Sequence, residues 1–320
     1  MKVNKANLST KDLLSLQDIN ARQITLVLNL ARVLKKKTKC PRSRQLLRGK
    51  IVGMIFQKPS TRTRVSFEAG IYQMGGNAVC LNYNDIQLSR GESIEDTART
   101  LSLYLDCIMA RVYDHSDIQK LANFANIPVI NGLSDSFHPC QALADLLTIS
   151  EYKGELKGLN LAWIGDGNNV CNDLLLGCAK TGINMTVACP KNYRPADELI
   201  QLAKYEAELT SAKVMVVDDP IIAAKDADVI VTDTFLSIGK ENESDVREPI
   251  FLFKYQVNRE LMKLTKRDAI FMHCLPVNRG KEVTSEVIDG KSSVVWSEAE
   301  NRMHVQKAIL LLLMKPNISL

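Results

Sequence analysis

The sequence lacks any apolar run long enough to cross a membrane. Its longest apolar run, residues 308–314, is far shorter than the roughly 20 residues that a membrane-spanning helix needs. The amino-terminal stretch MKVNKANLSTKDLLSL has no continuous apolar core and no cleavage site, so no secretory signal is predicted. We therefore expect a cytoplasmic protein in which residues 308–314 belong to a buried helix.

Paired cysteine motifs are also missing, although the chain contains eight cysteines. Neither CxxC nor a Cys/His cluster with zinc-ligand spacing occurs, which argues against the common structural zinc sites. Several cysteines lie inside apolar runs, where reduced, buried thiols are common: Cys80, Cys107 and Cys178. Unpaired thiols of this kind indicate a reducing compartment, in agreement with the expected cytoplasmic location.

Signatures of nucleotide and nucleic-acid binding are incomplete or absent. No GxxxxGK[ST] motif occurs, so no triphosphate site is predicted. The segment GDGNN at 165–169 holds the first two glycines of a dinucleotide fingerprint, but Val170 occupies the position of the third. No acidic residue follows the next apolar run, which also counts against NAD. The basic run 35–50 lacks interleaved aromatic residues, so no nucleic-acid partner is predicted.

Short apolar runs alternate with amphipathic segments, which is the pattern of parallel sheets covered by helices on both faces. The runs predicted as strands are 51–56, 78–81, 107–110, 127–130, 159–164, 184–189, 213–217, 228–232, 269–274 and 293–296. A predicted connecting helix within 140–158 separates two sets of strands. We therefore predict an α/β protein of two domains, each a parallel sheet flanked by helices. The expected domains are 1–140, completed by the carboxy-terminal helix 298–320, and 141–297.

Polar residues collect where the predicted strands end. Open parallel sheets bind ligands at the carboxyl ends of their strands. Separate fragments of the chain are therefore expected to meet in one active-site cleft between the domains. Besides Ser60–Arg64, the strand-end residues are Arg111, Asn131, Gly132, His138, Gln141, Asp233 and Cys274.

The densest group of hydrogen-bond donors is the stretch QKPSTRTRVSFEAG, residues 57–70. Pro59 ends a strand, and Ser60 with Thr61 supplies the N-cap of a helix predicted to run to Gly75–Gly76. A helix amino terminus offers free N–H groups and partial positive charge, and arginine forms charge-assisted hydrogen bonds with phosphate oxygens. One cap needs one hydroxyl, so the additional hydroxyls and arginines predict a phosphate site.

Four motifs, read in order, resemble the aspartate/ornithine carbamoyltransferase family. STRTR followed by SFEAG resembles its carbamoyl-phosphate loop, and HPCQALADLLT at 138–148 resembles its second signature. MHCLPVNRGKEV at 272–283 is similar to the His-Cys-Leu-Pro segment of ornithine-specific members, and AENRMHVQKA at 299–308 resembles the closing helix. Because the motifs span residues 60 to 308, the resemblance covers nearly the whole chain.

The resemblance implies transfer of the carbamoyl group of carbamoyl phosphate to the δ-amine of L-ornithine, which gives L-citrulline and phosphate. This activity would serve arginine biosynthesis, although the sequence leaves the reverse, catabolic direction open. The first domain is expected to hold carbamoyl phosphate and the second to hold ornithine. The resemblance also implies no metal, no organic cofactor, and a homotrimer with sites at subunit boundaries.

Residues that match the family motifs take their expected roles from the resemblance. Arg111, His138 and Thr63 are implied to polarise the carbonyl group, and Gln87 is implied to act across a subunit boundary. The implied carbamoyl-phosphate set is Ser60, Thr61, Arg62, Thr63, Gln87, Arg111, His138, Gln141, Cys274, Leu275 and Arg302.

The implied ornithine site lies in the second half of the chain. Asn169 is implied to bind the α-groups, and Asp233 and Cys274 are implied to hold and help deprotonate the side-chain amine. From the residues alone, a buried strand thiol is the favoured interpretation of Cys274, and an ordinary turn residue is the favoured interpretation of Asn169. The segment Ser237-Ile238-Gly239 resembles the family's Ser-Met-Gly loop, with isoleucine in place of methionine. The ornithine set is Asn169, Asp233, Ser237 and Ile238, and the catalytic set is Arg111, His138, Cys274 and Asp233.

Three other functions stay open. The chain fits a carbamoyltransferase for another amine, such as putrescine or a modified ornithine. The partial fingerprint at 165–169 keeps open a nicotinamide-dependent dehydrogenase. A non-catalytic relative that binds carbamoyl phosphate or serves as a regulatory partner is the third.

Overall fold

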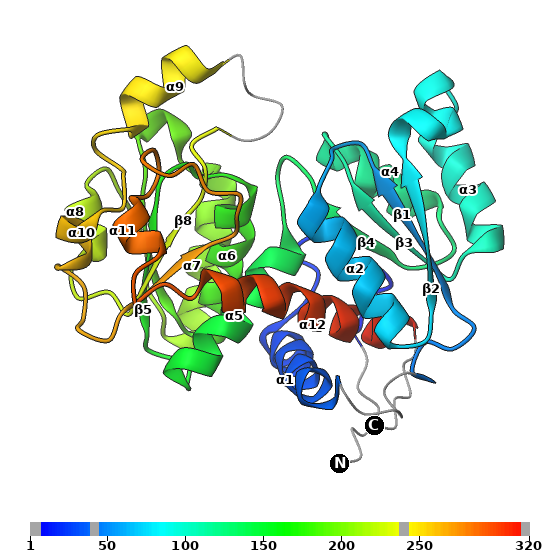
Figure 1. Ribbon diagram of the computed structural model, residues 1–320, viewed down its shortest axis with the longest axis horizontal. Helices are drawn as coiled ribbons and strands as arrows, with labels where there is room; N and C mark the ends of the chain where they lie inside the picture. Colours follow the sequence, from blue (N-terminus) through cyan, green and yellow to red (C-terminus); the bar gives the residue numbers. More distant parts are fainter. Residues whose placement is uncertain (1–7, 39–44, 237–242, 315–320) are drawn as a thin grey trace. The chain divides into compact units, whose positions relative to one another are not determined.

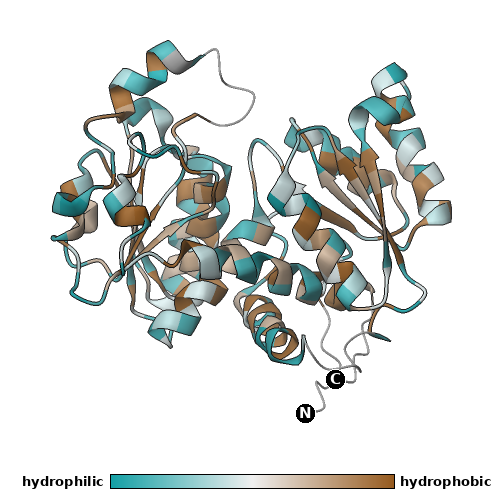
Figure 2. Cartoon of the chain, viewed as in Figure 1, coloured by the Kyte–Doolittle hydropathy of each residue, from teal (hydrophilic) through white to brown (hydrophobic). Residues whose placement is uncertain are grey.

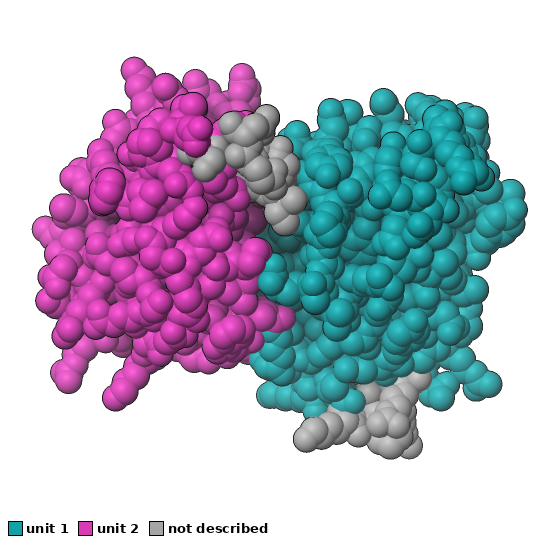
Figure 3. Space-filling model, turned by 45° about the horizontal axis from the view of Figure 1, so that its top comes forward, with its two compact units in different colours: residues 1–144, 300–320 teal, residues 145–299 magenta. Residues whose placement is uncertain are grey.

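The computed structural model describes residues 8–38, 45–236 and 243–314 (Figure 1). The chain divides into two compact units, which are coloured separately in Figure 3. Unit 1 comprises residues 1–144 and 300–320, and unit 2 comprises residues 145–299. The chain passes from one unit to the other inside α5 (Pro139–Lys153) and returns inside α12 (Val295–Met314).

Unit 1 contains a four-stranded parallel sheet of order β2-β1-β3-β4. Its strands are β1 (Ile51–Phe56), β2 (Asn77–Asn82), β3 (Cys107–Arg111) and β4 (Val129–Leu133). Its remaining α-helices are α1 (Ala21–Lys37), α2 (Thr61–Gln73), α3 (Ile94–Tyr104) and α4 (His115–Phe124). Because β2 lies on one side of β1 and β3 on the other, the winding direction reverses between β1 and β3. Ligands of open parallel sheets bind at such a reversal, outside the carboxyl ends of the strands.

Unit 2 contains a five-stranded parallel sheet of order β7-β6-β5-β8-β9. Its strands are β5 (Asn160–Ile164), β6 (Asn184–Ala188), β7 (Val214–Val217), β8 (Val229–Thr232) and β9 (Ile270–His273). Its other α-helices are α6 (Asn169–Thr181), α7 (Asp197–Thr210), α8 (Pro220–Ala224), α9 (Ser244–Phe251), α10 (Arg259–Met262) and α11 (Ser285–Ile288). Here the winding reverses between β5 and β8, so each unit has its own topological switch point.

The cores follow from strands that are apolar on both faces. Strands β3 and β8 are buried at every position, as expected for central strands covered by helices on two sides. Figure 2 shows the apolar colours concentrated on the strands and the hydrophilic colours on much of the outer helix surface. Within the described residues, no helix is long and apolar enough to span a membrane.

One predicted strand is wrong. The sequence predicts a strand at 293–296, but only Ser293 forms an isolated bridge, with Phe271, and α12 begins at Val295. A short apolar run does not distinguish a strand from the first turn of a buried helix. In this case the run continues into α12, where most residues from Val305 to Leu312 are fully buried.

A buried lysine on α12 gives unit 1 a distinctive dependence of stability on pH. The Lys307 ammonium bonds to Gln73 Oε1 at the end of α2, and burial lowers the pKa of Lys307 to about 8. In the unfolded chain lysine titrates near roughly 10.4, so between about pH 8 and 10 the unfolded state binds more protons at this residue. The contribution of Lys307 to the free energy of unfolding therefore rises with pH across that range.

We predict that wild type gains stability relative to Lys307→Met between about pH 8 and pH 10. Subtracting the two unfolding free energies, measured by urea denaturation at each pH, cancels the other titrating groups. A difference that stays constant across this range would show that the ammonium titrates normally in the folded chain.

Candidate active site

The predicted phosphate-binding residues of unit 1 lie at its topological switch point. Ser60 to Thr63 follow β1, and Arg111 is the last residue of β3, the strand paired with β1. Ser60 is the N-cap of α2, and its hydroxyl accepts a hydrogen bond from Thr63 N–H at 3.2 Å. Thr61 is exposed and Arg62 is half-buried, so the first turn of α2 presents open donors.

A buried guanidinium joins the helices that meet beside this turn. Arg302 of α12 donates to Thr63 Oγ1 at 3.2 Å and to the amide oxygen of Gln141 on α5. All three side chains are buried, and Gln141 is fully inaccessible. A fixed positive charge of this kind, held in place by hydrogen bonds, is suited to a polar or anionic ligand rather than to an apolar core.

Arg111 owes its position to an irregularity in the sheet. The register between β3 and β4 shifts at Ala110/Arg111, so that Arg111 pairs with Leu133 and Gly132 is passed over. A Cβ at Gly132 would meet the Met109 sulfur at 2.4 Å and the Ala110 carbonyl oxygen at 3.2 Å, so a larger residue there would require the Met109 side chain to move. Such bulges commonly re-aim a side chain next to an active site. Arg111 is only 7% exposed, so its guanidinium is held inside the unit rather than in solvent.

His138 is a neutral imidazole near the two arginines. Burial lowers the pKa of His138 well below its usual value, and the guanidinium groups of Arg302 and Arg111 lower it further. Within the described part of the chain, its buried Nδ1 atom has no hydrogen-bond partner. A neutral imidazole can donate one hydrogen bond to a carbonyl oxygen, and two neighbouring guanidinium groups would stabilise negative charge on that oxygen.

Of the predicted carbamoyl-phosphate set, Cys274 and Leu275 belong to unit 2, and within unit 1 Gln87 is not brought to this group. Gln87 lies in the short 3₁₀ helix Gln87–Arg90, and its side chain is exposed. Among the described residues of unit 1, no hydrogen bond links its side chain to Thr63, Arg111 or His138. Its predicted role therefore stays a prediction.

The switch point of unit 2 has a carboxylate at its centre. Asp233 directly follows β8 and is 8% exposed. Its two oxygens accept hydrogen bonds from Asn168 Nδ2 at 2.8 Å, from Cys274 Sγ at 3.0 Å and from Thr234 N–H at 2.7 Å. This arrangement fixes a negative charge where a ligand's ammonium group could bind.

Cys274 is a hydrogen-bond donor rather than a reactive thiolate. Burial raises the pKa of the Cys274 thiol well above its usual value, and the adjacent Asp233 carboxylate raises it further. A thiol held protonated in this way is a poor nucleophile. In the structure the Cys274 thiol therefore serves as a donor that orients the Asp233 carboxylate.

The turn after β9 is held by a buried pair that sequence reasoning missed. Leu275 has a left-handed backbone (φ 58°), and its N–H donates to His273 Nδ1 at 2.9 Å. His273 Nε2 lies 3.2 Å from Glu282 Oε1, and both side chains are fully buried. A left-handed leucine persists only where its surroundings enforce it. The one sequence signal was the polar pair of residues His273 and Cys274 at the end of an apolar run.

Asn168 was also missed, because the family resemblance pointed to its neighbour, Asn169. Asn168 caps α6 by accepting from Val170 N–H and Cys171 N–H, and its amide nitrogen reaches Asp233. The predicted residue, Asn169, is half-buried in the first turn of α6. Of the remaining ornithine-binding predictions, Ser237 and Ile238 lie outside the described residues.

Three potential metal ligands meet at this switch point. The ligand atoms of Asp233, His273 and Cys274 all lie within 4.8 Å of one another. Both ring nitrogens of His273 are engaged, by Leu275 N–H and by Glu282, and the Cys274 thiol is protonated. The donor set as it stands is thus closed by hydrogen bonds, and a metal would have to displace protons and break them.

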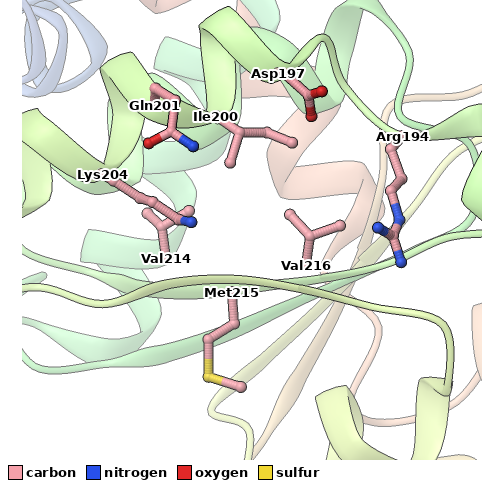
Figure 4. A pocket seen from close by; sticks show the side chains of 8 residues that line it. All are labelled: Arg194, Asp197, Ile200, Gln201, Lys204, Val214, Met215 and Val216. Atoms are coloured by element: carbon pink, nitrogen blue, oxygen red, sulfur yellow. The ribbon is translucent and has the colours of Figure 1, made fainter.

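A separate cavity of about 360 Å³ lies between α7 and the edge strand β7 (Figure 4). None of the predicted site residues is among the described residues that line it. Arg194, at its rim, is engaged by Asp218 at 2.6 Å. The lining residues are Arg194, Asp197, Ile200, Gln201, Lys204, Val214, Met215 and Val216.

Comparisons with known protein families match each half of the chain to one domain of the same family. The family description "Aspartate/ornithine carbamoyltransferase, carbamoyl-P binding domain" matches residues 11–151. The description "Aspartate/ornithine carbamoyltransferase, Asp/Orn binding domain" matches residues 157–313. The first matched region contains the polar residues of unit 1 described above except Arg302, and the second contains those of unit 2 together with Arg302.

Individual relatives agree with these matches over almost their full length. Ornithine carbamoyltransferase of Pyrococcus abyssi is 52% identical over 308 residues, covering 96% of this chain and 97% of the relative. The ornithine carbamoyltransferase of Bacillus subtilis is 51% identical, and the match covers 96% of this chain and 95% of the relative. The solved structure of the Pyrococcus furiosus enzyme matches with a TM-score of 0.92 at 51% identity, covering 96% of this chain and 98% of that one. The anabolic enzyme of Campylobacter jejuni matches with a TM-score of 0.89 at 40% identity, covering 95% and 99%.

Proposed function

The chain belongs to the aspartate/ornithine carbamoyltransferase family, and we propose that it transfers the carbamoyl group of carbamoyl phosphate to the δ-amine of L-ornithine. The products are L-citrulline and phosphate. The observation that carries this assignment is the division of charge. Unit 1 gathers guanidinium, hydroxyl and imidazole donors at one switch point, whereas unit 2 presents the Asp233 carboxylate at the other. The donors of unit 1 are complementary to an acyl phosphate, and the carboxylate of unit 2 is complementary to an alkylammonium group.

Carbamoyl phosphate binds through its phosphate at the amino terminus of α2. The free N–H groups of the first turn, the side chains of Ser60, Thr61 and Thr63, and the guanidinium of Arg62 supply donors for its oxygens. Gln141, Arg302 and the backbone carbonyl of Leu275 hold the carbamoyl end. Because the hydrogen bonds of Arg302 to Gln141 and Thr63 exist before the substrate binds, much of the catalytic advantage is positioning of the electrophile.

Arg111, His138 and Thr63 polarise the carbonyl oxygen. As the amine attacks, that oxygen gains negative charge, which the guanidinium and the neutral imidazole stabilise by hydrogen bonds. The new C–N bond forms, the C–O bond to phosphate breaks, and phosphate leaves with the electron pair. The proton released by the attacking nitrogen passes to the departing phosphate.

Ornithine is held by unit 2 with its side-chain amine at Asp233 and Cys274. Free alkyl amines titrate near roughly 10.4, so most of the substrate arrives as an ammonium that Asp233 can bind. Only the neutral amine attacks, so the buried Asp233 carboxylate first accepts the ammonium proton as a general base and then orients the amine. Asn169 binds the α-groups, and Ser237 and Ile238 are assigned to the same substrate by their place in the sequence motif.

The same proposal extends to assembly and direction. Gln87 is exposed on unit 1, which suits a residue that contacts the carbamoyl phosphate of a neighbouring protomer in a homotrimer. Light scattering would establish the oligomer, and Gln87→Ala should raise the KM for carbamoyl phosphate if it reaches the ligand.

We assign the chain the biosynthetic direction, the sense in which a relative 51% identical from Pyrococcus furiosus is named anabolic.

An amine panel tests the substrate. With carbamoyl phosphate fixed, L-ornithine should give citrulline at a kcat/KM far above that of putrescine, which lacks α-groups for Asn169, and of L-aspartate. Putrescine as the better substrate would leave the transferase chemistry intact and overturn the assignment of ornithine. An NADH fluorescence titration serves as the control for the dehydrogenase alternative and should show no saturable change.

A further inference from the structure

Gln57, the first residue after β1, connects two strands through its side chain and backbone. Its Oε1 atom accepts a hydrogen bond from Tyr113 N–H at 2.7 Å, and its Nε2 atom donates to Asp117 Oδ2 at 3.1 Å. Its backbone N–H donates to Arg111 O at 2.9 Å. The half-buried glutamine therefore uses one acceptor and two donors on the segment that leads from β3 into α4.

The segment that Gln57 contacts is the bulged end of β3. Val112 N–H donates to Leu133 O at 2.9 Å, and Tyr113 O accepts from Asp135 N–H at 3.2 Å. These bonds secure residues 112–113 on the β4 side, and Gln57 secures them on the β1 side. Because the register shift at Arg111 already departs from the regular ladder, the ladder alone does not fix this backbone.

Gln57 also lies three residues before Ser60, the N-cap of the phosphate-binding turn. One residue therefore ties the backbone that carries Arg111 to the backbone that carries the α2 amino terminus. A shift of about 1 Å between Arg111 and the phosphate-binding turn can cost on the order of 10²-fold in rate, because the reacting groups lose alignment.

The two hydrogen bonds of the Gln57 side chain require an amide, which has both an acceptor and a donor. The Tyr113 N–H needs an acceptor, and the Asp117 carboxylate needs a donor. Glutamine supplies both, whereas glutamate at this position would face Asp117 with a second carboxylate. Asparagine at position 117 would still accept from Gln57 through its amide oxygen, so the two positions are not equivalent.

We propose that Gln57 is a positioning residue for carbamoyl transfer. It holds Arg111 in a fixed position relative to the phosphate-binding turn, and the Asp117 carboxylate fixes which end of the Gln57 amide donates. This inference rests on the proposed function. In this proposal the effect of Gln57 on the reaction passes through Arg111, whose carbonyl oxygen accepts from the Gln57 N–H.

The test is a donor–acceptor swap measured by steady-state kinetics with ornithine and carbamoyl phosphate. Gln57→Glu should lower kcat and raise the KM for carbamoyl phosphate, reducing kcat/KM by about 10- to 10²-fold, with the KM for ornithine unchanged. Asp117→Asn alone should stay within about threefold of wild type, because its amide oxygen can accept from Gln57. The double variant should recover most of the lost activity. In it, the asparagine amide at position 117 can donate to the glutamate at position 57, whose carboxylate still accepts from Tyr113 N–H.

Gln201→Glu, which adds the same charge on an exposed position of α7, is the matched control and should leave all constants unchanged. Thermal unfolding of every variant separates misfolding from misalignment. If Gln57→Glu does not fold, recovery of folding and activity in the double variant still supports the proposed pairing of Gln57 with Asp117. The inference is overturned if Gln57→Glu folds with wild-type kcat/KM, or if the double variant is no better than Gln57→Glu. A wild-type chain that forms no citrulline would instead refute the proposed function.

Discussion

Asp233→Asn is expected to lower kcat/KM for ornithine by about 10²–10⁴-fold, the range typical for loss of a group that manages a proton in the transition state. Asparagine has nearly the same shape, so the α6 cap and the turn after β8 should survive. What disappears is the negative charge that binds the substrate ammonium and receives hydrogen bonds from Asn168 and Cys274. Because that charge lies in unit 2 and contacts the amine, the loss should appear in the constants for ornithine.

The measurement is steady-state kinetics with each substrate varied in turn. Asp226→Asn, an equal loss of charge at an exposed position of unit 2, is the matched control and should behave as wild type. The KM for carbamoyl phosphate should change little in either variant. An Asp233→Asn enzyme within about threefold of wild type for ornithine, against the 10²-fold or more expected, would remove the carboxylate from the proposed mechanism.

Arg111→Met is expected to lower kcat by about 10²–10³-fold, the usual cost of removing one donor from a developing oxyanion. Methionine fills much of the buried space at the end of β3 but supplies neither charge nor donors. The KM for carbamoyl phosphate should rise as well, because the guanidinium also contacts the bound ligand in the proposed complex. The constants for ornithine should change least.

The same variant has a second, independent readout at His138. The Arg111 guanidinium contributes to lowering the pKa of His138, after burial and Arg302. Removing it should raise the pKa of His138 while leaving it below the usual histidine value, since burial remains. Proton NMR titration of the imidazole in the two proteins measures this directly, with Arg267→Met, an exposed arginine of unit 2, as control. An unchanged titration would place Arg111 too far from His138 to share an oxyanion.

Strand positions were predictable because central parallel strands are continuous apolar runs. The predicted run 51–56 coincides with β1, and 107–110 ends one residue before β3 does. The failure at 293–296 has the same origin, since an apolar run bounded on one side by a buried helix has no period of its own. Fold class and activity were predictable from four motifs, and the family matches confirm both.

The finer organisation of the site was not readable from the sequence. Asn168 and Asn169 are adjacent amides, and only the partner at Asp233, 65 positions away, shows which one orients the carboxylate. Gln57 has no sequence motif of its own, and only its partners Tyr113 and Asp117 show what it holds. Likewise, the neutrality of His138 depends on burial and on two arginines from other elements. Each of these properties arises from long-range packing, which local sequence patterns do not encode.

The most direct test of the central claim follows the transferred carbon. Wild-type protein is mixed with ¹³C-labelled carbamoyl phosphate and L-ornithine, and the carbon resonance and released phosphate are measured together over time. If the chain transfers the carbamoyl group to ornithine, the label appears in the ureido carbon of citrulline, with one phosphate released for each citrulline formed. Phosphate release without labelled citrulline, or labelled carbon in any other product, would contradict it.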